Sequence, residues 1–164
     1  MKITSTATLL LALSLIFLSS YSCTRSVKET RLIHEDSSFS MIIASDSSEF
    51  KDRIRNSIIQ QYQNQGNIEV VNIRRLKDID PTVYDVVLIM DTCLAWSGFN
   101  PALIAFLEGN ESKDNVVLFM TAGDPDWTYS YQGVDAITSA SVVENEDVKF
   151  QEITQQIDQI IKNK

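Results

Sequence analysis

The chain has 164 residues, and its 14 basic and 22 acidic side chains give a net charge of −8 at neutral pH. This balance argues against a nucleic-acid-binding protein, because such proteins carry a basic stripe. His34 is the only histidine, which argues against a Ser-His-Asp triad and against a histidine-rich metal site.

The first 22 residues have the pattern of a secretory signal peptide. Lys2 supplies a positive charge, and an apolar run from Leu9 to Leu18 follows it. A ten-residue helix reaches only about 15 Å, half of a roughly 30 Å hydrocarbon core, so a membrane-spanning helix is not expected. The sequence therefore predicts a signal peptide over residues 1–22 and export of the remaining chain.

A cysteine follows this segment in the sequence S-S-Y-S-C, which ends at Cys23. The sequence resembles the lipobox of bacterial lipoproteins, although Ser20 and Tyr21 replace the family's leucine and small residue. The resemblance implies an acylated Cys23, a lipid anchor in the membrane and a polar tether over residues 23–38; plain secretion is the alternative. Cys93 would then have no partner for an intramolecular disulfide.

From residue 39 onward, short apolar runs alternate with helical patterns. Strands are predicted at Met41–Ser45, Asn67–Ile73, Tyr84–Met90 and Asn115–Thr121, with a weaker one at Val134–Ser139. Helices are predicted from Glu49, with Gly66 as the glycine that ends it, from Pro101, and over the C-terminal residues. The connections between strands two and three and between strands four and five look too short for full helices. Alternating strands and helices predict an α/β domain over residues 39–164, with a parallel sheet covered on both faces.

The stretch from Met90 to Gly109 resembles the flavodoxin family. In that family a segment G-T-P-x-W follows the third strand, and a helix that begins with proline comes next. Asp91, Thr92 and Cys93 stand at the first three of these positions, and Trp96 lies one place beyond the family's tryptophan. The resemblance implies a five-stranded parallel sheet in the order 2-1-3-4-5, with a ligand beyond the carboxyl ends of the strands.

The resemblance also implies a site for FMN. The family's phosphate loop, S-x-T-G-x-T, is matched by residues 45–50, with hydroxyl groups at Ser45, Ser47 and Ser48. Ser48 replaces the family's glycine and Phe50 its last threonine, while Asp46 and Glu49 add negative charge. The residues alone leave a second interpretation open, in which a serine caps the helix and Phe50 belongs to the core.

Further residues are implied around the flavin ring, namely Thr92, Cys93, Trp96, Thr121, Ala122 and Gly123. Several aromatic side chains could form walls for the ring or could cover the end of the sheet: Trp96, Phe99, Trp127, Tyr129 and Tyr131. Residues 135–141 loosely resemble a motif for covalent FMN attachment, with Ser141 as acceptor; a fifth strand is the alternative. Cys93 is either a reactive thiol or a buried inert one. Asp124 and Asp126 form either a turn or a cation site, and no metal is expected.

Two functions follow from these observations. The first is an exported, lipid-anchored FMN protein for electron transfer or redox chemistry, with an unknown protein or redox partner. The second is a flavin-free binding or structural module that retains the fold, since fold does not determine function. No nucleic-acid partner is expected for either.

Overall fold

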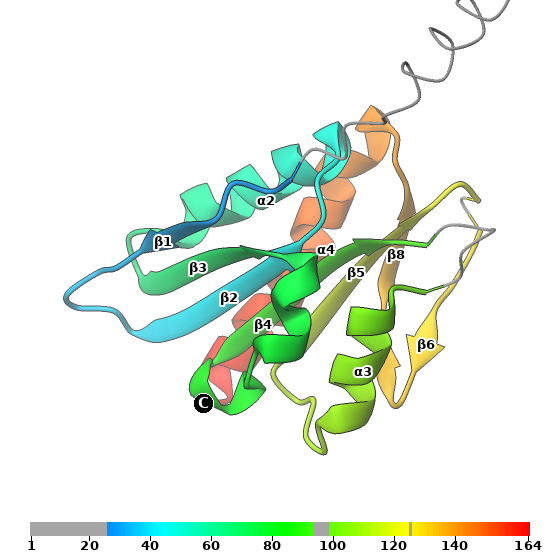
Figure 1. Ribbon diagram of the computed structural model, residues 1–164. Helices are drawn as coiled ribbons and strands as arrows, with labels where there is room; N and C mark the ends of the chain where they lie inside the picture. The colour runs from blue at the N-terminus through cyan, green and yellow to red at the C-terminus, as the bar shows by residue number, and fades with distance from the viewer. Residues whose placement is uncertain (1–25, 94–98, 125) are drawn as a thin grey trace, which may run out of the picture.

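The computed structural model describes residues 26–93, 99–124 and 126–164. Its main sheet has six strands in the order β1-β3-β2-β4-β5-β8. The strands are β1 (Thr30–Leu32), β2 (Phe39–Ser45), β3 (Gly66–Asn72), β4 (Val86–Thr92), β5 (Val116–Ala122) and β8 (Ile137–Ala140). The helices are α2 (Glu49–Tyr62), α3 (Pro101–Gly109) and α4 (Glu146–Lys162). Figure 1 shows the twisted sheet between these helices.

The prediction of an α/β fold is confirmed, but the predicted strand count is wrong. Strands β3, β2, β4, β5 and β8 are parallel and lie in the expected order. The sheet gains a sixth strand because β1 pairs antiparallel with β3, Thr30 opposite Val70 and Leu32 opposite Ile68. All three residues of β1 are exposed. A short exposed edge strand needs no apolar pattern, so the sequence carried no signal for it.

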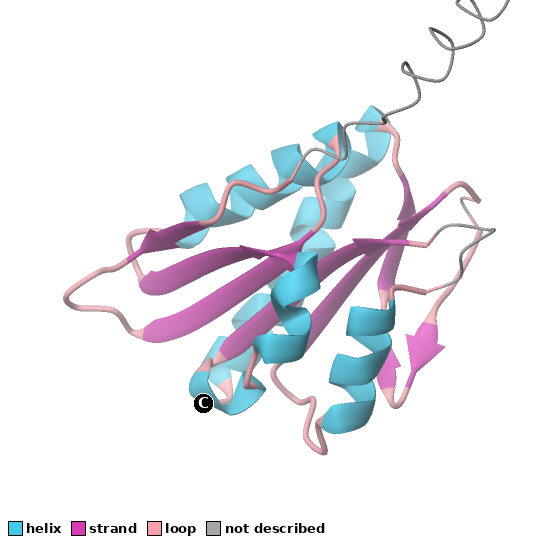
Figure 2. Ribbon diagram, in the orientation of Figure 1, coloured by secondary structure: helices cyan, strands magenta, loops and turns pink. Residues whose placement is uncertain are grey.

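Both faces of the sheet are covered, as Figure 2 shows. On one face α2 and α4 pack over the apolar side chains of β2, β4 and β5. On the other face α3 and the 3-10 helix η1 (Ile73–Asp78) cover a second apolar cluster. Strands β2 and β4 are buried almost along their whole length, as expected for central parallel strands with helices on both sides.

In their described residues, the two short connections contain no α-helix, as the sequence predicted. Between β3 and β4 the chain forms η1 and a second 3-10 helix, η2 (Pro81–Val83). Between β5 and β8 it forms the hairpin of β6 (Ser130–Tyr131) and β7 (Val134–Asp135). A further 3-10 helix, η3 (Val143–Asn145), precedes α4. In the part of the chain that the structure describes, no helix is long and apolar enough to span a membrane.

Gly66 has a different role from the predicted one. Helix α2 ends at Tyr62 with Gln63 as its C-cap, and Gly66 begins β3. A Cβ atom at this position would lie 2.5 Å from ring atoms of Phe39. Glycine is therefore required by the close approach of the Phe39 ring, and not by the end of the helix.

Candidate functional site

The carboxyl ends of β2, β4 and β5 lie side by side at one edge of the sheet. From β2 the chain continues through α2 to β3 on one side, and from β4 it continues through α3 to β5 on the other. This is the topological switch point at which doubly wound proteins bind their ligands. The side chains at this edge are therefore the candidates for a functional site.

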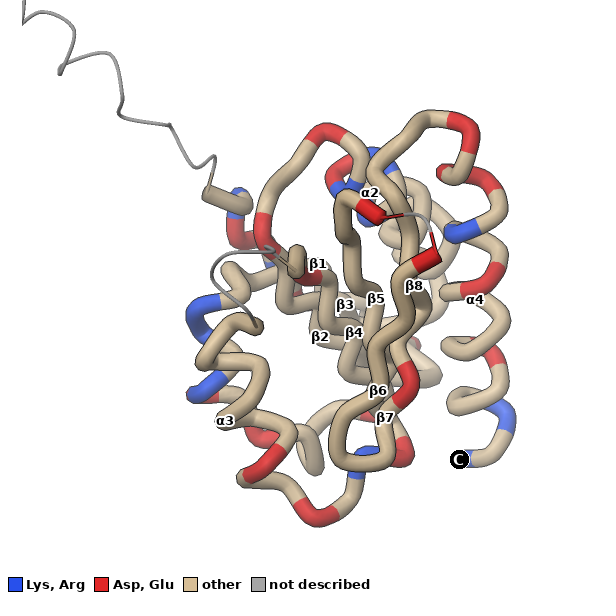
Figure 3. The backbone as a smooth tube through the Cα atoms, turned by 90° about the vertical axis from the view of Figure 1, so that its right-hand side faces the viewer, with Lys and Arg blue, Asp and Glu red and all other residues tan. Residues whose placement is uncertain are grey.

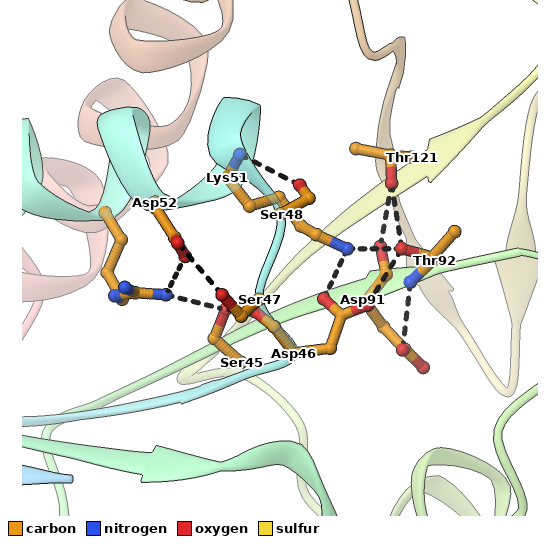
Figure 4. Close-up of polar contacts among 10 residues, drawn as sticks. Ser45, Asp46, Ser47, Ser48, Lys51, Asp52, Asp91, Thr92 and Thr121 are labelled. Carbon is orange, nitrogen blue, oxygen red and sulfur yellow. Dashed lines mark hydrogen bonds and ion pairs between the residues drawn. The ribbon is translucent and has the colours of Figure 1, made fainter. Parts of the chain in front are cut away.

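A buried lysine is the centre of the polar contacts at this edge (Figure 4). Lys51 comes from the first turn of α2, and its side chain is fully buried. Its Nζ forms an ion pair with Asp46 and donates a hydrogen bond to Thr92 Oγ1. Thr92 Oγ1 also lies 2.9 Å from Asp46 Oδ2 and 3.2 Å from Thr121 Oγ1. We call these four residues the Lys51 cluster.

Burial changes the acid–base properties of Lys51. It lowers the pKa of the amine from its ordinary value, and the carboxylates of Asp46 and Asp91 oppose that shift. Lys51 keeps its positive charge only if the nearby carboxylates offset the free energy that the amine loses when it leaves water. At the switch point, the ammonium group of Lys51 and the carboxylate of Asp46 therefore form an ion pair within the protein.

Asp91 is a second buried carboxyl group at this edge, only 3% exposed. Its Oδ1 accepts a hydrogen bond from the backbone N–H of Thr92 at 2.9 Å. Its Oδ2 has no hydrogen-bond partner among the described residues. Burial raises the pKa of Asp91 to about 6, and the negative charge of Asp46 adds to this rise. Asp91 thus titrates close to neutral pH.

The three hydroxyl groups predicted at the phosphate are already engaged within the protein. Ser45 is fully buried and donates to the backbone oxygen of Asp46 at 2.6 Å. Ser47 donates to Asp52 Oδ2 at 2.9 Å. Ser48 is the N-cap of α2 and accepts from the N–H of Lys51 at 3.2 Å. The helix-cap interpretation of this segment is therefore the one that the structure shows.

Phe50 belongs to the core, which is the second interpretation that the sequence left open. It is 4% exposed, and its ring centroid lies 6.3 Å from that of Phe119. Glu49 points outward, with its side chain 82% exposed, and pairs with Arg53 at 2.7 Å. The loop thus holds an apolar core residue where the family has a hydroxyl group.

The loop before α2 and its first turn carry two carboxylates, each paired with a basic side chain: Asp46 with Lys51 and Asp52 with Arg55. The carboxylates of Asp46 and Asp52 lie on either side of the loop serines and are partly exposed. Two like charges about 5 Å apart cost on the order of 3 kcal/mol at an effective dielectric constant of about 20. With the three serine hydroxyl groups engaged within the protein, a phosphate at this position would have to displace those hydrogen bonds.

At the ring end of the expected site, the side chains pack against the protein itself. Thr92 and Thr121 belong to the Lys51 cluster, and the N–H of Cys93 donates to the carbonyl oxygen of Thr121 at 2.8 Å. Cys93 is half-buried and packs against the apolar cluster under α3. Ala122 ends β5 and Gly123 follows it as an exposed residue. Trp96 lies outside the described residues.

The aromatic side chains stack on one another. Phe99, Trp127, Tyr129 and Tyr131 form a continuous group with neighbouring ring centroids 4.5 to 6.4 Å apart. Tyr129 is 7% exposed and belongs to the apolar cluster on the α3 face. Tyr129, Trp127 and Tyr131 thus pack on the apolar cluster of the α3 face, while Trp96 lies outside the described residues.

The remaining candidates have structural roles. Residues 137–140 form β8, and Ser139 donates to the carbonyl oxygen of Ala140, so the segment matches the strand interpretation. Ser141 follows the strand as an exposed residue. The N–H of Asp126 donates to Asp124 Oδ1 at 3.0 Å, as in a turn. Among the described residues, no group of three or more acidic, histidine or cysteine side chains could hold a metal ion.

Sequence reasoning missed Lys51, the residue on which this site depends. A signal was present, because Lys51, Arg55 and Ile58 recur at spacings of four and three and share the inner face of the helix. A lysine on an apolar face, five residues after Asp46, indicates a buried ion pair. Lysine is almost never fully buried unless it is paired.

The chain was compared with known families, curated proteins and solved structures. No family model matches it, and no curated protein matches its sequence. Among solved structures, the crystal structure of oxidised Flavodoxin 1 from Bacillus cereus aligns with a TM-score of 0.43 and 10% identity. The alignment covers 73% of this chain and 97% of that chain.

Proposed function

We propose that this protein is an exported, lipid-anchored binding module that works without flavin. The observation that carries the proposal is the Lys51 cluster. Its ion pair and hydroxyl groups fill the switch point of the sheet with the protein's own side chains. A doubly wound sheet that binds a cofactor leaves this position open to the ligand.

The engaged serines support the same proposal. Ser45, Ser47 and Ser48 each have a partner within the protein, and freeing Ser48 would break the cap of α2. An FMN-dependent redox protein, the other function that the sequence suggested, would direct such hydroxyl groups, together with the backbone N–H groups of the helix N-terminus, at the phosphate. The flavin-free module requires no rearrangement of the loop.

The sequence supports the export and the lipid anchoring of the protein. The apolar run from Leu9 to Leu18 followed by Cys23 supports a signal peptide and an acylated cysteine. Two or more acyl chains give stable attachment, whereas one gives only marginal binding. We therefore place the domain outside the cytoplasm, held at a membrane surface.

The test is the absorption spectrum of the purified mature protein, followed by calorimetric titration with FMN. We expect a colourless protein that gives no heat of binding. A flavodoxin purified and titrated alongside serves as the positive control. A yellow sample, or an FMN affinity in the micromolar range, would contradict the proposal and establish the flavin-binding alternative.

A further inference from the structure

The chain first packs against the core of the domain only a few residues after Cys23, so the link to the proposed anchor is short. Val27 is 4% exposed and belongs to the core on the α2 face. Glu29 accepts from the N–H of Asn72 at 3.2 Å and pairs with Arg75 at the same distance. Three residues lie between Cys23 and Val27, and the four Cα–Cα steps that join them span at most about 14 Å. An acyl group on Cys23 would therefore hold this edge of the domain at the membrane.

Basic side chains gather around this point of entry. Lys28 and Arg31 lie on the entering segment, and η1 beside it carries three more. We define the basic edge as Lys28, Arg31, Arg74, Arg75 and Lys77, all of them exposed. Figure 3 shows basic residues on the side of the molecule where the chain enters.

The basic edge is locally positive in an acidic protein. Its five basic side chains stand against three acidic ones, Glu29 and Asp78 in the same segments and Glu69 on the adjacent strand β3; Glu69 pairs with Arg31 and Glu29 with Arg75. The whole chain has 14 basic and 22 acidic side chains, so the remainder is strongly negative. The charge distribution thus sets this edge apart from the rest of the molecule.

The basic edge also has a shallow pocket and, at the end of β1, exposed apolar side chains. Arg31 and Arg75 line one shallow pocket of about 200 Å³, together with their partners Glu69 and Glu29. Leu32 is 36% and Ile33 is 72% exposed at the end of β1. Basic residues with exposed apolar neighbours are typical of surfaces that lie at the boundary between headgroups and acyl chains.

We propose that the basic edge binds anionic phospholipid headgroups and orients the anchored domain with β1 toward the membrane. The inference rests on the lipid anchor of the proposed function. Each lysine or arginine near an anionic surface contributes about 1 kcal/mol, and the attraction fades within a Debye length. The opposite edge, formed by β8 and the β6–β7 hairpin, then points away from the membrane.

The orientation is tested with two matched fluorescent labels on the acylated protein in vesicles. The labels are attached to cysteines introduced by Thr30→Cys on β1 and by Ser130→Cys on β6. Both substitutions replace exposed polar residues of a strand. Each is made with Cys93→Ser, so that only the new cysteine in the domain is labelled. Vesicles contain phosphatidylcholine alone or with phosphatidylglycerol, together with a lipid that carries a nitroxide on its headgroup.

We expect the label at residue 30 to be quenched at least about twofold more than the label at residue 130 in anionic vesicles, with the difference decreasing as salt rises. The double change Arg74→Glu with Lys77→Glu should abolish the difference. Lys113→Glu with Lys162→Glu alters the net charge equally outside the basic edge and should preserve it. Equal quenching of both labels, or loss of the difference in both double variants, would overturn the proposal.

Failure of the anchor is distinguishable from failure of the basic edge. Without acylation at Cys23, the mature protein lacks the mass of the acyl group and does not sediment with phosphatidylcholine vesicles. That result would overturn the lipid anchor and this inference together. An acylated protein that sediments with both vesicle types but shows equal quenching would overturn only the role of the basic edge.

Discussion

Lys51 combines a charged side chain with complete burial, and its contacts explain how the fold accommodates it. Its Nζ meets the carboxylate of Asp46 and the hydroxyl group of Thr92, which in turn contacts Thr121. Removing one partner of a buried pair is costly because the other charge is left uncompensated, whereas replacing both can be nearly neutral. A double-mutant cycle can therefore separate the pair from its surroundings.

We predict that Lys51→Met lowers the free energy of unfolding by about 3 kcal/mol, the lower end of the range for buried pairs because Asp46 keeps some solvent contact. Asp46→Asn in addition should recover part of this loss. Urea unfolding of the wild type, both single variants and the double variant gives the coupling energy. A coupling below about 0.5 kcal/mol would show that the two side chains act independently.

Asp91 should make the free energy of unfolding decrease as pH rises, the opposite of the effect of a carboxyl group that is stabilised in its ionised form. Its folded pKa, about 6, lies above the ordinary value of 3.8 because the carboxyl group is buried. The protonated group therefore favours the folded state at low pH, and this contribution is lost as pH rises through 6. A difference of that size corresponds to at most about 3 kcal/mol.

Asp91→Asn should remove this contribution, so the variant should gain stability relative to the wild type as pH rises from about 4 to about 7. The difference between the two unfolding free energies, measured across that range, isolates Asp91 from the other carboxyl groups. Asp124→Asn is the matched control, because Asp124 is exposed. Parallel pH profiles for the wild type and Asp91→Asn would contradict the assignment.

Helix α2 shows how one element serves both the core and the candidate site. Phe50, Ile54, Ile58 and Tyr62 face the core, while Ser48 caps the helix and Lys51 enters the polar cluster. The loop before it is held by the cap and by the bond from Ser47 to Asp52. The site's geometry therefore depends on the packing of this helix.

Phe50→Ala should destabilise the fold by about 3–5 kcal/mol, since the ring is buried against Phe119 and its removal leaves a cavity. Glu49→Ala, one residue away and largely exposed, should change stability by less than about 1 kcal/mol. Both are measured by urea unfolding. If Phe50→Ala cost no more than its neighbour, Phe50 would belong to a surface loop.

The elements differed in how well the sequence predicted them. Strands β2, β4 and β5 are apolar and buried on both faces, and α2 repeats its apolar residues at helical spacing, so each carries a strong local signal. Strand β1 is short and exposed, and it exists only because β3 offers a free edge. The partners of Ser45, Ser47 and Lys51 depend on rotamers and tertiary contacts, which the residue types at these positions leave open.

At the scale of the whole molecule, the N-terminal segment joins the domain to the proposed anchor. Of residues 23–38, expected as a polar tether, the structure describes 26–38, and part of this segment packs on the fold. Val27 lies in the core and Thr30–Leu32 form β1. A short connection keeps the domain close to the anchor, whereas a long flexible tether would let the domain rotate freely.

Val27 provides a test of this connection. Val27→Ala should lower the free energy of unfolding by about 2 kcal/mol, since it removes two buried carbon groups and leaves a cavity. Val143→Ala is the matched control, because Val143 is 64% exposed and the same atoms are removed from a solvated position. Urea unfolding of both variants makes the comparison. If the two variants were equally stable, the segment before β1 would be a tether without core contacts, and the anchor would no longer fix the orientation of the domain.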